Sequence, residues 1–249
     1  MTLSPDTRAT LKQYAEEYET AEFINGDPSW FMHQVSGDKN QETIAFLAAA
    51  LSYGSRKQFL PKIENFLIWS GNEPYQWVKS GLFNEVFQPD DKGCYYRLYN
   101  KHQMWLFLNR YEQLLAEYGS LKAYVAKVSE RNTLKAIDAL CTWFGESGTI
   151  VIPRDTKSAC KRLCMFMRWM VRDSSPVDTG IWADIINKDT LIIPLDTHVL
   201  TEAVELGLIS SRNASMQAAL KLTDIMRQVF PDDPTRGDFA LFGYGVNKE

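Results

Sequence analysis

The sequence lacks the short motifs that identify the commonest enzyme classes. It has no phosphate-binding loop, no glycine fingerprint of a dinucleotide fold, no HExxH zinc motif and no GxSxG nucleophile turn. These absences exclude most nucleotide-binding, metalloprotease and α/β-hydrolase functions. The three His are scattered through the chain, so we expect neither a dedicated transition-metal site nor a cofactor.

Cysteine is also scarce, and its spacing is uninformative for metal binding. The four Cys (Cys94, Cys141, Cys160 and Cys164) include no pair with zinc-finger spacing. Cys160 and Cys164 lie one helical turn apart in an apolar run, which favours buried thiols over a mutual disulfide. We therefore expect a reduced, cytoplasmic protein.

Long apolar runs are absent as well. Runs such as LCMFM are far shorter than the roughly 20 residues that a helix needs to cross a bilayer. The first residues, MTLSPDTRATLKQ, have no apolar signal core. We expect no membrane association and a monomer.

The composition is that of a globular protein with a mildly acidic surface. Apolar residues make up 45% and charged residues 23% of the 249 positions, enough for one large domain or two small ones. The net charge of −4 argues against a general nucleic-acid binder. It leaves room for a local basic patch, because salt screens charge beyond about 10 Å.

Apolar residues recur at helical spacing along most of the chain, and Gly, Pro, Asn and Asp interrupt them. This pattern predicts an all-α fold of about twelve helices with essentially no sheet. The run from Ile44 to Tyr53 is small and apolar, which predicts a helix buried nearly all round. For residues 95–99 (YYRLY) the pattern does not decide between a strand and a loop.

Residues 153–172 concentrate positive charge and are expected to form one basic helix. Six cations against the single anion Asp155 give a local net charge of +5: Arg154, Lys157, Lys161, Arg162, Arg168 and Arg172. Four of them share one side of the expected helix, with spacings of four, seven and four. The pattern fits either an ordinary solvated face or a phosphate-binding surface.

Asp196 is the second candidate, because IPLDTHVLTEAVELGL places it where a new helix begins. Asp is a favoured N-cap residue, so a capping role alone would explain its presence at this position. Capping is compatible with catalysis, since a cap fixes the direction of the carboxylate.

Three segments in order resemble helix-hairpin-helix DNA glycosylases of the endonuclease III kind. IPLDTHVLTEAVELGL resembles the segment that closes the active site. IAFLAAALSYGSRKQFLPKIENF is similar to the early buried helix, which ends in a Leu-Ser turn next to DNA. LTDIMRQVFPDDPTRGDFALFGYGV is similar to the final helices. The helix KRL-x-x-F-x-RWMVR also resembles the hallmark of a smaller bacterial family of unknown function.

The resemblance implies two helical lobes with a cleft between them. Residues 40–172 would form a central lobe with the degenerate hairpin and the basic helix. Residues 1–39 and 173–249 would form the second. It implies base-excision repair of double-stranded DNA, by a glycosylase with possible abasic-site lyase activity.

The resemblance also assigns roles to residues of this chain. Asp196 would be the ionised catalytic carboxylate, and Lys157 the nucleophile, with Lys161 as its rival. The DNA contacts would be Arg154, Arg168, Arg172, Ser52, Gly54, Ser55 and Arg56.

The chain departs from that pattern at three places. Pro153 is followed by Arg154, Asp155 and Thr156 rather than by the glycines of the hairpin. An insertion at 173–194, which contains Asp178, separates the candidate lysines from Asp196. The cysteines that hold an iron-sulfur cluster in that family are absent. Two other functions therefore stay open: a non-catalytic nucleic-acid-binding or protein-binding module on the same scaffold, and a helical interaction protein with no nucleic-acid role.

Overall fold

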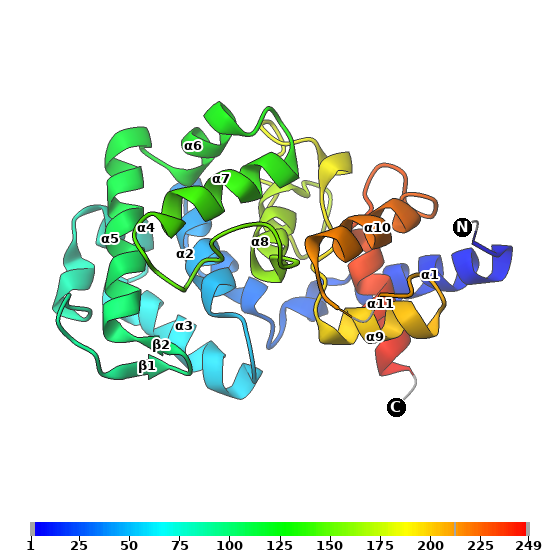
Figure 1. Cartoon of the computed structure of the whole chain (residues 1–249), viewed down its shortest axis with the longest axis horizontal. Helices are drawn as coiled ribbons and strands as arrows, with labels where there is room; N and C mark the ends of the chain where they lie inside the picture. Colours follow the sequence, from blue (N-terminus) through cyan, green and yellow to red (C-terminus); the bar gives the residue numbers. More distant parts are fainter. Residues whose placement is uncertain (1–2, 212, 248–249) are drawn as a thin grey trace. The chain divides into compact units, whose positions relative to one another are not determined.

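A computed structural model describes residues 3–211 and 213–247 of the chain (Figure 1). Within these ranges the regular structure is helical, except for a two-stranded antiparallel hairpin of β1 (Cys94–Tyr96) and β2 (Tyr99–Asn100). The all-α prediction is confirmed, and the open segment 95–99 lies in that hairpin. Among the described helices, none combines the length and apolar character that a membrane span requires.

The chain divides into two compact units. Unit 1 contains both ends of the chain, and unit 2 contains most of the sequence between them. Unit 1 comprises Met1–Ile24, Asn132–Leu134 and Thr156–Glu249; unit 2 comprises Asn25–Arg131 and Lys135–Asp155. The sequence placed residues 156–172 with the central lobe. The structure assigns them to unit 1, because the helix they contain forms ion pairs with segments near both chain ends.

Unit 2 is built from helices around one buried helix, α2 (Asp38–Leu51). Its other elements are η2 (Pro28–His33), α3 (Arg56–Ser70), α4 (Pro74–Lys79), η3 (Leu82–Glu85), β1, β2, α5 (Lys101–Tyr118), α6 (Leu121–Val128) and most of α7 (Thr133–Gly145). Residues 44–51 of α2 are each no more than 2% exposed, as their apolar run predicted. Phe46 packs against the rings of Phe107, Tyr111 and Phe144, with centroids 5.3–5.6 Å apart.

A buried carboxylate ties α2 to α6. The side chain of Glu42 accepts hydrogen bonds from the backbone N–H groups of Leu121 (2.8 Å) and Lys122 (2.9 Å). Ser120 accepts a third bond, from the N–H of Ala123. Helix N-termini leave their first N–H groups without intrahelical partners. Glu42 and Ser120 therefore supply acceptors that α6 cannot supply itself.

Unit 1 joins the two ends of the chain. It contains α1 (Pro5–Tyr18), η1 (Ala21–Ile24), α8 (Lys161–Val171), η4 (Lys188–Thr190), α9 (Thr197–Glu205), α10 (Met216–Met226) and α11 (Arg236–Val246). The first and last helices, α1 and α11, pack against each other (Figure 1). Gly243 makes this possible, because a Cβ there would lie 2.4 Å from the ring of Tyr18.

Replacing Glu42 by Ala should destabilise unit 2 by about 2–3 kcal/mol, because two buried N–H groups lose a charged acceptor. The stability of Glu42→Gln should fall between those of the wild type and Glu42→Ala, since the amide keeps one acceptor oxygen. The measurement is urea-induced unfolding followed by circular dichroism. Glu64→Ala is the matched control, because Glu64 is exposed on α3 and its loss should change stability by less than about 0.5 kcal/mol. Equal stability of the Glu42 and Glu64 variants would contradict the capping role.

Candidate functional site

The candidate site in unit 1 is a lysine and an aspartate at the starts of two helices. Lys161 is the first residue of α8, and Asp196 is the N-cap of α9. The Lys161 Nζ lies 3.7 Å from the Asp196 Oδ2. The two side chains are 31% and 35% exposed, so a substrate can reach the pair while the protein shields part of it.

Asp196 performs the capping role that its position predicted. Its Oδ1 accepts a hydrogen bond of 2.9 Å from the backbone N–H of Val199. One carboxylate oxygen is thereby fixed by the helix, and the other faces Lys161. The preceding residues 191–195 are buried and lie outside any helix, and the N–H of Ile193 donates to Thr223 on α10 (3.1 Å). The position of the Asp196 carboxylate is thus set on both sides.

Lys161 is positioned by a short pairing of distant segments. Ser158 and Ser215 form an isolated antiparallel bridge, and the N–H of Met216 donates to the carbonyl of Lys157 at 3.4 Å. Cys160 then turns the chain into α8 with a φ of +46°. A left-handed conformation costs a residue other than Gly roughly 1–2 kcal/mol. The chain accepts this strain directly before the candidate nucleophile.

The expected helix over 153–172 is shorter than predicted. Helix α8 begins at Lys161, so Lys157 lies outside it and does not share a helical face with the later cations. Lys157 is exposed. The geometry pairs Asp196 with Lys161, which the sequence analysis gave as the alternative nucleophile. Between α7 and α8, residues 146–148 form a turn and residues 149–160 contain no helix. Arg154 is exposed within this segment.

Arg172 was expected to contact DNA, and the structure contradicts this. Its side chain is 3% exposed, and its Nε donates to Asp233 at 2.8 Å. Its terminal nitrogens pair with Asp178 and Glu19. Burial lowers the pKa of Arg172, but the charges of Asp178, Asp233 and Glu19 outweigh it and raise the pKa above its ordinary value. A buried guanidinium whose nitrogens are bonded to carboxylates in this way cannot contact DNA phosphates.

Arg168, also expected to bind DNA, is buried in the same cluster. Its side chain is 3% exposed and pairs with Asp238 of α11 and with Asp178, whose Oδ1 lies 3.5 Å from the Arg168 Nε. The guanidinium lies 4.5 Å from the ring centroid of Phe239. The spacing along α8 correctly placed Arg168 and Arg172 on one side of the helix. That side faces carboxylates of unit 1 rather than solvent.

The insertion at 173–194 has a structural role. Asp178 is the shared partner of the two buried arginines, so it is not exposed to a substrate. The N–H groups of Thr179 and Gly180 donate to the carbonyl of Trp169, which holds the segment against α8. Gly180 has a φ of +65°, and a Cβ there would lie 2.4 Å from the Cα of Asp173. Only glycine fits this close approach.

Asp238 links the buried cluster to the candidate site. Burial raises the pKa of Asp238 to about 6; Arg168 and Lys161 lower it, and Asp196 and Asp178 raise it further. Asp238 therefore senses both members of the Lys161–Asp196 pair. The sequence did not single out Asp238, since no local pattern relates position 238 to positions 161 and 196.

In unit 2, the predicted DNA-contacting turn between α2 and α3 is only partly exposed. Ser52 is buried and donates to the carbonyl of Ala48 (2.7 Å), so it is unable to reach DNA. Gly54, Ser55 and Arg56 are exposed. The Arg56 guanidinium lies 3.3 Å from Asp27 with its side chain 52% exposed, which leaves it accessible.

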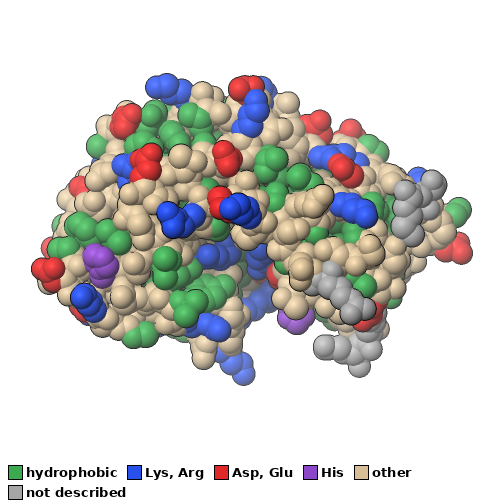
Figure 2. Space-filling model, in the orientation of Figure 1, with side chains coloured by type: hydrophobic (Ala, Val, Ile, Leu, Met, Phe, Trp, Pro, Cys, Tyr) green, Lys and Arg blue, Asp and Glu red, His purple; other side chains and the backbone are tan. Residues whose placement is uncertain are grey.

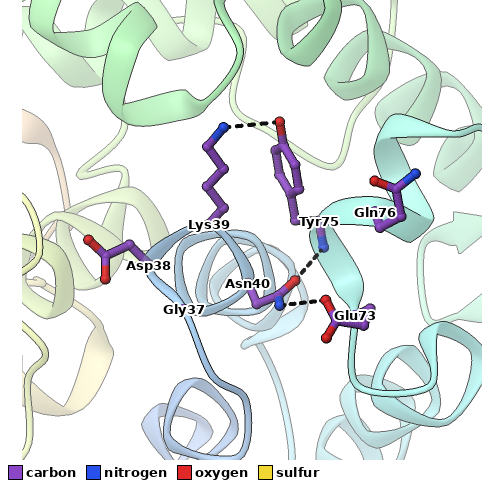
Figure 3. A pocket seen from close by; sticks show the side chains of 7 residues that line it. All are labelled: Gly37, Asp38, Lys39, Asn40, Glu73, Tyr75 and Gln76. Atoms are coloured by element: carbon purple, nitrogen blue, oxygen red, sulfur yellow. Dashed lines mark hydrogen bonds between the residues drawn. The ribbon is translucent and has the colours of Figure 1, made fainter.

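A shallow hollow of about 560 Å³ lies elsewhere in unit 2, beside the starts of α2 and α4 (Figure 3). Asn40 accepts from the N–H of Tyr75 (3.2 Å) and donates to Glu73 (2.8 Å). Lys39 donates to the Tyr75 hydroxyl (3.4 Å). These polar groups bond one another, and the hollow contains no predicted site residue. Within residues 3–211 and 213–247, no three His, Cys, Asp or Glu side chains converge as metal ligands would.

Comparison with known proteins assigns the chain to a family. A family model described as "Protein of unknown function (DUF2400)" matches residues 27–247. The chain belongs to the DUF2400 family. No curated protein matches the chain, and no solved structure matches it. The DUF2400 match includes α8, the Lys161–Asp196 pair and Asp238, so the whole candidate site lies in the part that defines the family.

Replacing Arg172 by Leu should destabilise the protein by roughly 3–5 kcal/mol, because Asp233 loses its guanidinium partner and Asp178 and Glu19 each lose one of their two cations. Thermal unfolding of the variant measures the loss. Arg154→Leu removes a cation from the exposed segment before α8 and should change stability by less than about 0.5 kcal/mol. If the two variants unfold alike, Arg172 is not structural.

The Asp238 carboxyl should titrate with a midpoint near pH 6, measured by its carbon chemical shift. Lys161→Ala should raise that midpoint and Asp196→Asn should lower it, because the two charges act on Asp238 with opposite sign. The unfolded carboxyl ionises near 3.8. The folded state therefore holds the proton more tightly, and the contribution of Asp238 to stability falls as pH rises from about 4 to about 6. Identical midpoints in both variants would contradict the proximity.

Proposed function

We propose that the protein is a DNA glycosylase with abasic-site lyase activity that acts on damaged double-stranded DNA, with Lys161 as nucleophile and Asp196 as the assisting carboxylate. The observation that supports it is the 3.7 Å approach of the Lys161 Nζ to the Asp196 Oδ2. The order of the segments along the chain supports it as well, since Asp196 lies in a stretch that resembles helix-hairpin-helix glycosylases and Lys161 precedes it, in the place of the family's catalytic helix. Lys161 takes the role first given to Lys157.

The chemistry needs an amine and a carboxylate in contact. Asp196 accepts a proton from the Lys161 ammonium, directly or through water, and frees the amine lone pair. The amine bonds to C1′ of the sugar as the bond from C1′ to the base breaks. The base leaves with that electron pair and takes up a proton. The proton that the base takes up is the one that Asp196 accepted, so the carboxylate is ionised again and stabilises the positive charge that develops on the sugar carbon as the bond to the base breaks.

Strand cleavage follows from the same intermediate. The bond between C1′ and the ring oxygen breaks, the oxygen takes up a proton, and C1′ and the lysine nitrogen form a Schiff base. Loss of a C2′ proton then expels the 3′ phosphate. Without amine attack, a water activated by Asp196 would remove the base and leave the strand intact.

The exposed cations are the groups available for phosphate contact. Arg154 in unit 2 and Lys157 in unit 1 are exposed on the chain leading to α8, and Ser55 and Arg56 are exposed at the start of α3. Phosphate contacts of this kind give affinity that falls steeply with salt. We also propose that the protein is a monomer and that it is cytoplasmic. The cytoplasmic location is supported by its cysteines, which form no disulfide among the described residues.

A second candidate is a non-catalytic nucleic-acid-binding module. The observation in its favour is the loss of the glycine hairpin, together with the use of Arg168 and Arg172 for folding rather than binding. It predicts salt-dependent DNA binding without covalent chemistry.

The deciding experiment is borohydride trapping on duplex DNA that contains an abasic site. Hydride adds to the iminium carbon and leaves a stable secondary amine between enzyme and DNA. Lys161→Ala should reduce the trapped complex by more than about a hundredfold. Lys157→Ala is the matched control. With protein in excess over the DNA, the loss of one phosphate contact should lower trapping only slightly, because Lys157 lies outside the pair. Trapping that survives Lys161→Ala and disappears in Lys157→Ala would overturn the assignment. No trapping by the wild type, with DNA binding intact, would favour the binding module.

A further inference from the structure

The last two turns of α11 in unit 1 present an apolar ridge to solvent, formed by Phe242 and Val246. The two side chains are 38% and 47% exposed and lie one helical turn apart. Among the described residues of unit 1, they are the large apolar side chains that are exposed. Exposed apolar groups that occur together, rather than singly, are typical of contact sites.

The ridge is held in place by other aromatic rings. The ring of Phe242 makes edge contacts with Tyr18 of α1 and Phe23 of η1, with centroids 5.6 Å and 5.3 Å apart. Phe23 in turn contacts the buried ring of Phe239, at 4.9 Å. The Asn247 amide donates to the Tyr18 hydroxyl (2.8 Å). A partner therefore meets a surface that is already ordered, which lowers the entropic cost of binding.

The helices around the ridge carry acidic residues and lack basic ones. Both α1 and α9 pack on α11. Residues 13–24 contain Glu16, Glu17, Glu19 and Glu22, residues 197–208 contain Glu202 and Glu205, residues 237–247 contain Asp238, and these three ranges contain no Lys or Arg. The cations that border them in the sequence are Lys12, Arg212, Arg236 and Lys248, of which Arg212 and Lys248 lie outside the described residues. Where Figure 1 places α9, the described part of the near face in Figure 2 shows an acidic side chain and no Lys or Arg.

Two of these carboxylates are neutralised within the protein. Glu19 pairs with Arg172 and Arg236, and Asp238 pairs with Arg168. Both therefore belong to the ion-pair cluster of unit 1 and contribute little to the charge of the ridge.

The remaining carboxylates give the ridge a negatively charged rim. Glu17 and Glu22 are exposed and precede the two rings that hold Phe242. On the side of α9, Glu202 lies against α11, since a Cβ at Gly245 would be 3.4 Å from its carboxyl carbon. An anionic rim repels the phosphates of nucleic acids and of anionic lipids, and it attracts cations.

We propose that this ridge docks a cationic amphipathic helix of another protein. The apolar face of that helix covers Phe242 and Val246, and its Lys or Arg side chains pair with Glu17 and Glu22. An amphipathic helix binds an apolar surface in this way, and complementary charges select the partner and its orientation. Docking of this kind needs no chemistry at Lys161, so it stands or falls apart from the proposed enzyme.

The test uses the full chain and a fluorescein-labelled amphipathic helical peptide of Lys and Leu, followed by fluorescence anisotropy. The wild type should bind this peptide and should not bind a Glu–Leu peptide of the same pattern. Phe242→Ala should weaken binding at least about tenfold, because the central aromatic anchor is lost. The double variant Glu17→Lys/Glu22→Lys should weaken binding by a similar factor and remove most of its salt dependence. The double variant keeps the test decisive if Phe242→Ala fails to fold, since both of its positions are exposed.

The matched controls lie in unit 2. Ile68→Ala truncates another exposed apolar side chain, and Glu64→Lys/Glu85→Lys makes the same change in net charge at two exposed positions. Both should bind the Lys–Leu peptide as the wild type does. Equal binding by the ridge variants and the controls, or no binding by the wild type, would overturn the proposal. A wild-type dimer that Phe242→Ala dissociates in sedimentation equilibrium would also overturn it, because the ridge would then bind a second copy of the chain.

Discussion

The fold of unit 1 depends on two guanidinium groups that are almost completely removed from water. A buried charge is tolerated only when opposite charges and hydrogen bonds replace its hydration. Arg168 and Arg172 obtain theirs from the end of α1, from the loops around 178 and 233, and from α11. The arginines thereby fix where those segments must meet. Lys161 is the first residue of the same helix, and its side chain is partly exposed.

This arrangement explains why a basic helix was a misleading signal. The spacing of the cations showed that two arginines share a side of α8, but helical periodicity carries no information about what that side faces. The acceptors of Arg172 include Asp233 and Glu19, which are 61 and 153 positions away in the sequence. Ion pairs over such separations leave no local pattern. The all-α class and the burial of α2, by contrast, follow from apolar periodicity within single helices.

The candidate site was predictable to the same extent. The residue type and position of Asp196 predicted a cap, and the structure has that cap. The choice between Lys157 and Lys161 depended on where α8 begins. The helix begins late because residues 157–159 pair with 214–216 and Cys160 adopts a left-handed conformation. Neither feature involves a glycine or a proline that would mark it in the sequence. The approach of Asp238 is likewise a tertiary effect.

The discontinuity of unit 1 has a consequence for how the chain folds as it is made. Glu19 bonds Arg236, 217 positions later, and α1 packs on the last helix. On the ribosome, the residues of unit 2 emerge and can fold before α11, the helix on which α1 packs, has been synthesised. Unit 1 closes only after the final helix has left the exit tunnel. Until then Arg168 and Arg172 lack the carboxylates of Asp238 and Asp233, so the ion pairs of α8 are completed only after these residues have emerged.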